Sequence, residues 1–231
     1  MLVKSILRSI GFDFVRYDKI KILFIKLFNK YASHTMIPEK IYVDNLELIN
    51  GFLKKNIAGD VVECGVWRGG MIAGIASISG KERKYFLFDS FEGLPKANEI
   101  DGKAAMDWQK DVNSKIYFDN CTAEQSYAIE LMTSLNVNFE IHKGWFDKTL
   151  VNLPPSTNIA ILRLDADWYD STMVCLKELY NKVVQNGLII IDDYYVWDGC
   201  SRAVHDFLAS INSISRIYCF NNSICYIIKK D

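Results

Sequence analysis

The sequence predicts an α/β protein with a doubly wound, mostly parallel sheet of seven strands. From residue 60 onward, short apolar runs rich in β-branched residues alternate with helical stretches, a pattern typical of a parallel sheet covered by helices on both faces. The last two runs are joined only by Asn221 and Asn222, a link too short for a crossover helix. We therefore expect these two strands to form an antiparallel hairpin that closes the sheet.

The expected elements follow from these runs in order. Strands are expected over residues 61–66, 85–88, 139–142, 159–164, 188–191, 215–220 and 224–228, and helices over residues 70–78, 122–135, 171–185 and 202–211. Thr122 and Ser171 are the expected N-caps of their helices. Asn186 and Gly187 should end the helix before them, because glycine accepts the left-handed cap conformation. Residues 92–121 show no clear period, and loops of that length are commonly lids or disordered segments; we expect a lid.

Size and composition limit the organisation of the chain. A chain of 231 residues, half of them hydrophobic, can bury one substantial core but not two. We expect one main domain over residues 51–231, preceded by a helical segment over residues 1–50 that serves in packing, in a dimer or on the substrate side. The formal net charge of −1 gives no reason to expect a nucleic acid partner. The six cysteines lack metal-ligand spacing, which indicates reduced thiols and a cytoplasmic protein.

The first 30 residues are basic, with seven Lys or Arg against two Asp, a local charge of +5. Leu2, Val3, Ile6, Leu7 and Ile10 have helical spacing, which predicts an amphipathic helix. We expect it to pack on its own domain or on the partner in a homodimer. Peripheral contact with an anionic membrane is the alternative. The longest apolar run, residues 22–25, is too short for a membrane span or a signal sequence.

A glycine-rich turn follows the first expected strand, with the pattern Glu63-x-Gly65-x-x-x-Gly69-Gly70. Glycines let the backbone approach a ligand, and the helix that follows supplies N–H donors. The spacing differs from the G-x-G-x-x-G of dinucleotide sites, so it favours a methionine-containing nucleoside over a nicotinamide. Asp89 follows the second strand, where a carboxylate can accept hydrogen bonds from both ribose hydroxyls. The alternative is that Asp89 only caps the turn after it.

The loop after the third strand should lie beside the adenine pocket by topology. Gly144, Trp145 and Phe146 are expected to flank the base there, although aromatic residues at such a place are also common in ordinary packing. The full set of expected cofactor-binding residues is Glu63, Cys64, Gly65, Val66, Gly69, Asp89, Ser90, Phe91, Gly144, Trp145 and Phe146.

Carboxylates also follow two neighbouring strands of the expected sheet. Asp165 follows one strand, and Asp192 and Asp193 follow the next. Residues just past the carboxyl ends of adjacent strands meet in one crevice, and three carboxylates there repel one another unless a cation joins them. Oxygen ligands select magnesium, manganese or calcium over zinc. The alternative is that the aspartates are strand-end caps or are neutralised by Arg163 and Arg202.

If the methionine-containing nucleoside is a sulfonium that donates a methyl group to a hydroxyl, the reaction requires a good oxygen nucleophile. An unactivated alcohol is a poor one near neutral pH. A metal ion favours the alkoxide, while a neighbouring carboxylate accepts the proton. Asp167, two residues beyond Asp165, is the expected base; Asp165 itself, His142 and His205 are rivals. Asp165 and Asp167 are thus the expected catalytic residues.

Five motifs in this order resemble the macrocin O-methyltransferase family: VVECGVWRGG, FDSFEGLP, GWFDKTL, LRLDADWYDST and IIIDDYYVWDGCSRAV, spanning roughly residues 60–207. The resemblance implies the class I methyltransferase fold and methylation of a sugar hydroxyl with S-adenosylmethionine and Mg²⁺. It also implies metal ligation by Asp165, Asp192 and Asp193, cofactor contacts from Glu63, Gly65 and Asp89, and a mobile lid after Phe91. The chain departs from the family pattern in its basic N-terminal segment and in His205, where an acid is expected, which leaves the acceptor and the oligomer open.

Two other functions remain at the level of the sequence. One is an NAD-dependent oxidoreductase acting on a nucleotide sugar, which the glycine spacing and the closing hairpin disfavour. The other is a non-catalytic module that binds a membrane or a partner through residues 1–30, which the intact set of carboxylates disfavours.

Overall fold

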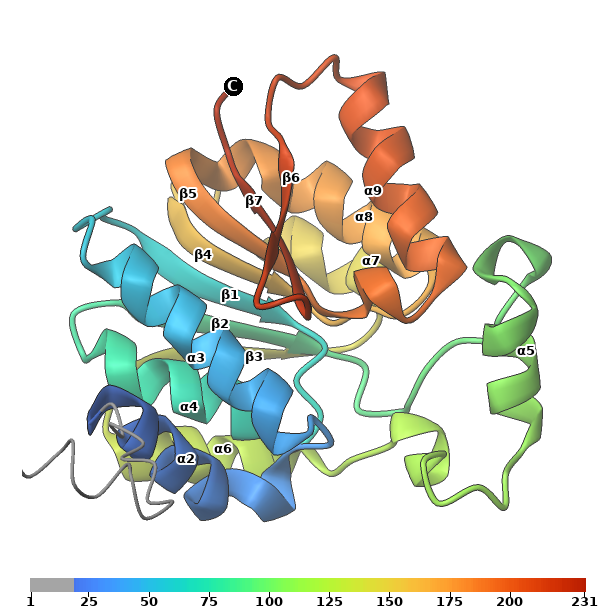
Figure 1. The fold of residues 1–231 in the computed structure, drawn as a ribbon, viewed down its shortest axis with the longest axis horizontal. Helices are drawn as coiled ribbons and strands as arrows, with labels where there is room; N and C mark the ends of the chain where they lie inside the picture. The colour runs from blue at the N-terminus through green and yellow to red at the C-terminus, as the bar shows by residue number, and fades with distance from the viewer. Residues whose placement is uncertain (1–18) are drawn as a thin grey trace, which may run out of the picture.

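The computed structural model describes residues 19–231, and its centre is one seven-stranded sheet in the order β3-β2-β1-β4-β5-β7-β6 (Figure 1). The first five strands are parallel, and β7 runs antiparallel to both β5 and β6. The expected doubly wound sheet with a closing hairpin is therefore confirmed. The strands are β1 (Asp60–Cys64), β2 (Lys84–Asp89), β3 (Asn138–Lys143), β4 (Ile159–Leu164), β5 (Val183–Ile191), β6 (Ile217–Phe220) and β7 (Ile224–Ile228).

Helices cover both faces of the sheet (Figure 1). One face carries α2 (Lys19–Tyr31), α3 (Glu39–Leu53), α4 (Gly70–Ser79) and α6 (Gln125–Leu135), and the other carries α7 (Phe146–Thr149), α8 (Tyr169–Leu179) and α9 (Asp198–Ser210). Helix α5 (Lys103–Lys110) stands apart, beyond the carboxyl ends of the parallel strands. Short 3-10 turns are η1 (Ala32–His34), η2 (Glu99–Asp101), η3 (Phe118–Cys121), η4 (Leu150–Asn152), η5 (Tyr180–Lys182) and η6 (Asp192–Tyr195).

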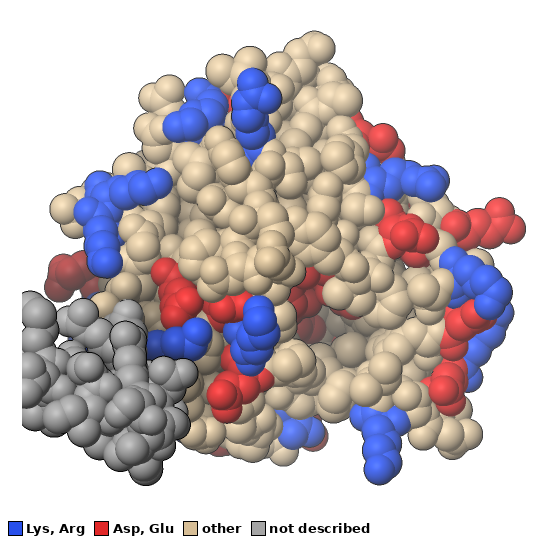
Figure 2. All heavy atoms as spheres, in the orientation of Figure 1, with Lys and Arg blue, Asp and Glu red and all other residues tan. Residues whose placement is uncertain are grey.

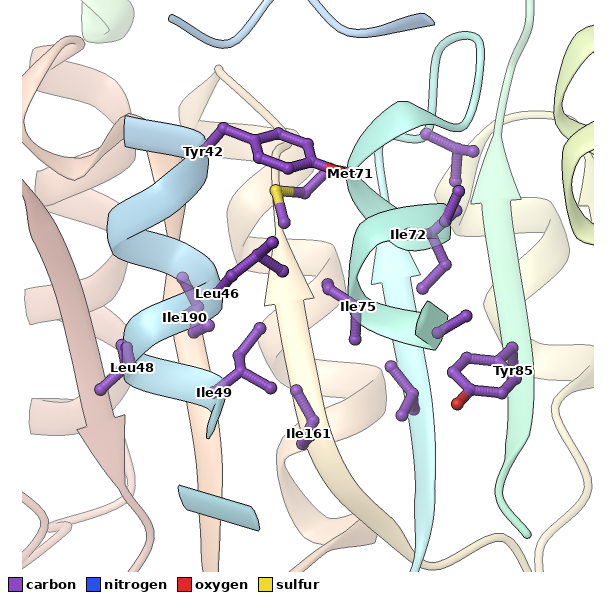
Figure 3. Close-up of a cluster of buried hydrophobic side chains, with 14 of the residues drawn as sticks. Tyr42, Leu46, Leu48, Ile49, Met71, Ile72, Ile75, Tyr85, Ile161 and Ile190 are labelled. Carbon is purple, nitrogen blue, oxygen red and sulfur yellow. The ribbon is translucent and has the colours of Figure 1, made fainter. Parts of the chain in front are cut away.

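The larger of the two main cores lies between the sheet and helices α3 and α4 (Figure 3). Leu46 and Ile49 of α3 and Ile75 of α4 are fully buried against Ile161 and Ile190 of the central strands. Each such side chain contributes about 1.5–3 kcal/mol by leaving water. Strands buried on both faces read as continuous apolar runs, which explains why the sequence located them.

The described part of the N-terminal segment packs on its own domain. The Tyr31 hydroxyl of α2 lies 3.0 Å from Ser77 Oγ of α4, and the Tyr42 hydroxyl of α3 donates to the Gly70 carbonyl over 2.9 Å. The amphipathic helix expected near residues 2–10 lies outside the described residues, so its membrane and dimer alternatives stay predictions. Within residues 19–231, no helix has the length and apolarity needed to cross a membrane.

Several expected helix boundaries were wrong. Helix α6 begins at Gln125 rather than Thr122, which does not cap it, and α8 begins at Tyr169 rather than Ser171. The predicted helix over residues 171–185 ends at Leu179. Helix α9 begins four residues earlier than predicted.

Asn186 and Gly187 do not end a helix but lie inside strand β5. Asn186 has a φ of +63° and marks an irregularity at which the pairing of β4 with β5 shifts register. Its N–H donates to the Lys229 carbonyl over 2.8 Å, and the Lys229 N–H donates to the Gly187 carbonyl over 3.0 Å. The backbone hydrogen bonds to the chain after β7 therefore decide the structure of this dipeptide, whose composition also suits a helix end.

The segment over residues 92–121 contains α5 and two 3-10 turns, which its lack of period did not predict. Its first half is fixed to the body of the domain. The buried Asp101 carboxylate accepts a hydrogen bond from the Tyr169 N–H at the start of α8 over 2.8 Å, and Trp168 Nε1 donates to the Pro95 carbonyl over 2.9 Å. Residues 95–101 are therefore attached to the body of the domain, and movement of the rest of the segment as a lid stays a prediction.

Candidate active site

A cavity of about 670 Å³ opens at the carboxyl ends of the central strands. Strands β1 and β4 lie side by side there, and their chains continue to helices on opposite faces of the sheet. This is the position at which doubly wound sheets bind ligands, and the volume is typical of a small-molecule site. Figure 2 shows a recess right of centre with acidic atoms along its wall.

The glycine turn after β1 brings two strand-end loops into contact. Gly65 has a φ of +84°, and a Cβ atom built on it would lie 1.8 Å from the Asp165 carbonyl oxygen. The Asp165 N–H in turn donates to the Cys64 carbonyl over 2.8 Å. Only glycine fits at this point, so the β1 turn and the first aspartate after β4 share one wall of the cavity.

Asp89, at the end of β2, bridges the first two strand-end loops. Its Oδ2 accepts hydrogen bonds from the N–H groups of Val66 and Trp67, and its Oδ1 accepts one from Phe91, each over 2.7 Å. Burial raises the pKa of Asp89, and the three backbone donors oppose the rise. A carboxylate accepts about four hydrogen bonds, so one position remains for a ligand. Asp89 therefore caps the turn after it through the Phe91 N–H, as the alternative prediction stated. A contact between Asp89 and a ribose stays a prediction.

The structure brings most of the expected cofactor residues to the cavity wall, namely Glu63, Gly65, Val66, Asp89, Ser90, Gly144, Trp145 and Phe146. Three others lie elsewhere. The Cys64 side chain is buried in the core on the other face, because successive residues of a strand point to opposite sides. Gly69 packs against Ala128 of α6, and Phe91 is buried beside the wall.

Arg163 of β4 lies at the centre of a buried charge network. Its Nη1 donates to Glu63 Oε1 and to Asp165 Oδ2, each over 2.9 Å, and its Nη2 lies 2.6 Å from Asp192 Oδ1. Burial raises the pKa of Glu63 to about 8, although Arg163 opposes the rise. Glu63 Oε2 is buried without a hydrogen-bond partner among the described residues, so the cavity wall retains an unsatisfied acceptor.

Three aspartates cluster next to this network. Oxygen atoms of Asp165, Asp167 and Asp193 lie within 4.8 Å of one another. The sequence placed Asp165 and Asp193 in a metal site together with Asp192, whereas the structure brings Asp167 into the cluster. Asp192 lies at its side, drawn to the buried guanidinium of Arg163.

The cluster has the chemistry of a cation site. Burial and the nearby Asp192 raise the pKa of Asp165 to about 6, and burial and Asp165 raise the pKa of Asp167 to about 8. Burial and Asp167 also raise the pKa of Asp193 well above its ordinary value. Several carboxylates in so small a space resist joint ionisation unless a cation joins them, and their oxygen atoms suit magnesium, manganese or calcium.

The two histidines considered as bases lie away from the cavity. His142 stacks on Phe88 with ring centroids 4.5 Å apart, and His205 Nε2 lies 2.8 Å from the Tyr194 hydroxyl. Neither belongs to the residues that line the cavity, whereas Asp165 and Asp167 both do.

The sequence did not single out the loop at residues 34–38 as part of the wall. Residues 34–38, between α2 and α3, line the side of the cavity that faces the N-terminal helices, and Trp108, Tyr195, Val196 and Trp197 line it as well. The loop carries no local pattern that distinguishes it from a connection. Only the general assignment of residues 1–50 to packing or to the substrate side pointed there.

The sheet order, the glycine turn after β1 and the acidic residue after β2 define a class I methyltransferase fold. The sequence profile of the macrocin O-methyltransferase family (TylF) matches residues 29–221, so the chain belongs to this family. The expected family is thereby confirmed, and the oxidoreductase alternative is set aside. The chain is an O-methyltransferase that depends on S-adenosylmethionine.

Two similar proteins are natural-product methyltransferases from Streptomyces. Demethyldecarbamoylnovobiocin O-methyltransferase of Streptomyces niveus is 32% identical over 188 residues, covering 78% of this chain and 70% of the relative. The 8-demethyl-8-(2,3-dimethoxy-alpha-L-rhamnosyl)-tetracenomycin-C 4'-O-methyltransferase of Streptomyces olivaceus is 34% identical over 182 residues, covering 76% and 68%.

Solved structures agree with the fold. The O-methyltransferase NovP superposes with a TM-score of 0.73 at 25% identity, covering 91% of this chain and 98% of that one. The calicheamicin methyltransferase CalS11 superposes with a TM-score of 0.62 at 19% identity, covering 96% and 98%.

Proposed function

We propose that this enzyme transfers the methyl group of S-adenosylmethionine to a hydroxyl of a sugar or glycosylated small molecule, with Mg²⁺ or another hard divalent cation held by aspartates. The observation that carries the proposal is the cluster of Asp165, Asp167 and Asp193, which lines the same cavity as the glycine turn after β1. Relatives support the acceptor class, since one is named for a rhamnosyl-tetracenomycin and another for mycinamicin III.

The cofactor would lie across the carboxyl ends of β1, β2 and β3. We assign its methionine part to Gly65 and to the unsatisfied Glu63 Oε2, which can accept a hydrogen bond from an ammonium group. The one remaining acceptor position of Asp89 suits a ribose hydroxyl. Gly144, Trp145 and Phe146 would then flank the adenine.

The carboxylates would divide two tasks. We assign the cation to Asp165, Asp192 and Asp193. Asp192 would keep its Oδ1 paired with Arg163 and offer its other oxygen to the ion. Asp167 is then the group that accepts the acceptor proton, because its carboxylate lines the same cavity and lies next to the proposed ligands Asp165 and Asp193. A bound divalent cation supplies Lewis acidity that makes the acceptor hydroxyl easier to deprotonate.

The acceptor would enter between the loop at residues 34–38 and the turn that holds Tyr195 and Val196. These residues line the cavity opposite the cofactor loops, and Trp108 and Trp197 add aromatic surface next to the aspartates. Aromatic rings give a flat apolar face on which a sugar ring can pack, while the carboxylates take its hydroxyls.

We further propose that the enzyme is cytoplasmic and can form a homodimer. All six cysteines are free, as expected in a reducing compartment. Sedimentation of the full chain beside a variant that lacks residues 1–18 tests the dimer.

The experiment is methyl transfer from deuteromethyl-labelled S-adenosylmethionine to a panel of nucleotide sugars and glycosides, followed by mass spectrometry. We expect a labelled product in the presence of Mg²⁺ and none with excess chelator. Equal turnover in chelator would rule out the cation. Failure of the chain to bind S-adenosylhomocysteine in calorimetry would rule out the whole proposal.

A further inference from the structure

The indole of Trp197 donates a hydrogen bond to a carboxylate of the aspartate cluster. Its Nε1 donates to Asp167 Oδ1 over 3.1 Å. The indoles of Trp67, Trp108 and Trp168 donate instead to the backbone carbonyls of Thr122, Ile116 and Pro95. A neutral N–H directed at an acidic group, rather than at the nearest backbone, fixes where that group points.

Asp167 is held from two sides. Its own φ of +55° lies in the left-handed region, and its N–H donates to Asp193 Oδ2 over 3.0 Å. The backbone is thus tied to one aspartate while Trp197 holds the side chain. Among the described residues, the indole of Trp197 is the one side-chain donor to the Asp167 carboxylate, so without it the carboxylate could rotate away from the cluster.

The Trp197 ring is in turn held by two other indoles. Its centroid lies 5.3 Å from that of Trp168 and 6.0 Å from that of Trp108. Trp168 is almost fully buried, whereas Trp108 belongs to α5. Edge-on and tilted packing of this kind stabilises ring pairs beyond the area they bury. A chain of contacts therefore leads from α5 through Trp197 to Asp167.

We propose that Trp197 is a positioning residue that holds the Asp167 carboxylate toward the aspartate cluster, and that Trp108 holds Trp197 in place from the α5 side. The catalytic consequence rests on the role proposed above for Asp167. The hydrogen bond itself and its dependence on Trp108 do not.

The first test uses the indole N–H signals in a ¹H–¹⁵N spectrum of the full chain, which has five tryptophans. Trp197→Phe identifies the Trp197 signal by its loss, and Trp67, bonded to a backbone carbonyl, is the internal control. We expect Asp167→Asn and Trp108→Ala each to move the Trp197 signal and to leave that of Trp67 in place. A Trp197 signal that stays in place in Asp167→Asn overturns the proposal, and one that stays in place in Trp108→Ala overturns the part played by α5.

The second test separates positioning from folding and from cation binding. Trp197→Phe keeps an aromatic ring but loses the donor that bonds to Asp167, and Trp197→His, whose ring N–H replaces that of the indole, is the matched control. We expect Trp197→Phe to lower kcat about 10- to 100-fold, as for loss of a hydrogen bond to a charged group. Mn²⁺ affinity, S-adenosylhomocysteine affinity and Tm should match those of Trp197→His. Equal kcat in the two variants would contradict the proposal.

The two tests also distinguish this inference from the proposed function. If the wild-type chain shows no methyl transfer, the proposed function fails while the indole spectrum still decides whether Trp197 holds Asp167.

Discussion

Arg163 Nη1 lies 2.9 Å from Glu63 Oε1, and both side chains are only 1% exposed. The same nitrogen lies 2.9 Å from Asp165 Oδ2, so one buried cation joins the acidic residue of β1 to the aspartates after β4. The proposed methionine and metal sites therefore share a single rigid support. Removing the Arg163 guanidinium should therefore lower the stability of the fold, whether or not substrate is bound.

Replacing Arg163 with methionine should destabilise the protein by about 3–5 kcal/mol, because Glu63, Asp165 and Asp192 would lose their counter-charge in the interior. Urea unfolding at neutral pH measures the change. Adding Glu63→Gln to the Arg163→Met variant should recover part of the loss. An Arg163→Met variant as stable as wild type would show that the network contributes nothing to the stability of the fold.

Asp165→Asn and Asp193→Asn should each weaken Mn²⁺ binding about tenfold or more, since even residues behind the ligands contribute a factor of that size. Tm should not fall, because each change removes a repelling charge from the cluster. Titration calorimetry measures the affinity, and Asp206→Asn, an exposed carboxyl on α9, is the control. Unaltered Mn²⁺ binding in both variants would place the cation elsewhere.

Gly65→Ala should abolish binding of S-adenosylhomocysteine and destabilise the fold, because its Cβ would overlap the Asp165 carbonyl and its φ of +84° suits only glycine. The matched control is Gly51→Ala in α3, where a Cβ meets nothing within 4 Å. That variant should gain about 0.5–1 kcal/mol of stability from helix propensity. Binding by Gly65→Ala at wild-type affinity would contradict the contact between the two strand-end loops.

Asp44 of α3 should make stability depend on pH below about 4. Its Oδ2 lies 2.6 Å from Lys40 Nζ, and its two oxygens accept hydrogen bonds from Asn221 and Ser223 of the β6–β7 turn. Burial alone would raise the pKa of Asp44. The hydrogen bonds from Lys40, Asn221 and Ser223 together lower it by more than burial raises it, so the pKa lies below its ordinary value of 3.8. The stabilisation is therefore present above that value and is lost as the pH falls through the lowered pKa.

Asp44→Asn should accordingly cost about 2 kcal/mol at pH 7, typical of hydrogen bonds to a charged group. Urea unfolding across pH 3–7 should show the difference from wild type shrink at the acid end. A difference that grows toward low pH would reverse the assigned direction of the shift.

Much of the fold was predictable because buried parallel strands are continuous apolar runs. The bounds of β4 and β7 agree with the expected ranges, and the short Asn221-Asn222 link fixed the hairpin. The start of β5 was missed because Val183 and Val184 continue the apolar spacing of α8. Pairing with distant strands decides their state, and no local pattern records it.

The sequence predicted only those parts of the site that follow from the convergence of neighbouring strand ends. That rule placed Asp165 and Asp193 together, and both lie in the aspartate cluster. It could not say that Arg163 would draw Asp192 aside, or that Trp197, five residues beyond, would hold Asp167. Such partnerships depend on side-chain directions at the ends of β4 and β5, which sequence spacing does not determine.

The proposed site holds a divalent cation beside the sulfur of the cofactor. Mn²⁺ broadens the proton signals of nearby groups, so the most direct measurement is its effect on S-adenosylhomocysteine bound to the protein. We predict strong broadening of the protons next to sulfur, weaker broadening of the adenine protons, and loss of both effects in Asp165→Asn. Stronger broadening at the adenine, or equal broadening in Asp165→Asn, would contradict this position of the cation.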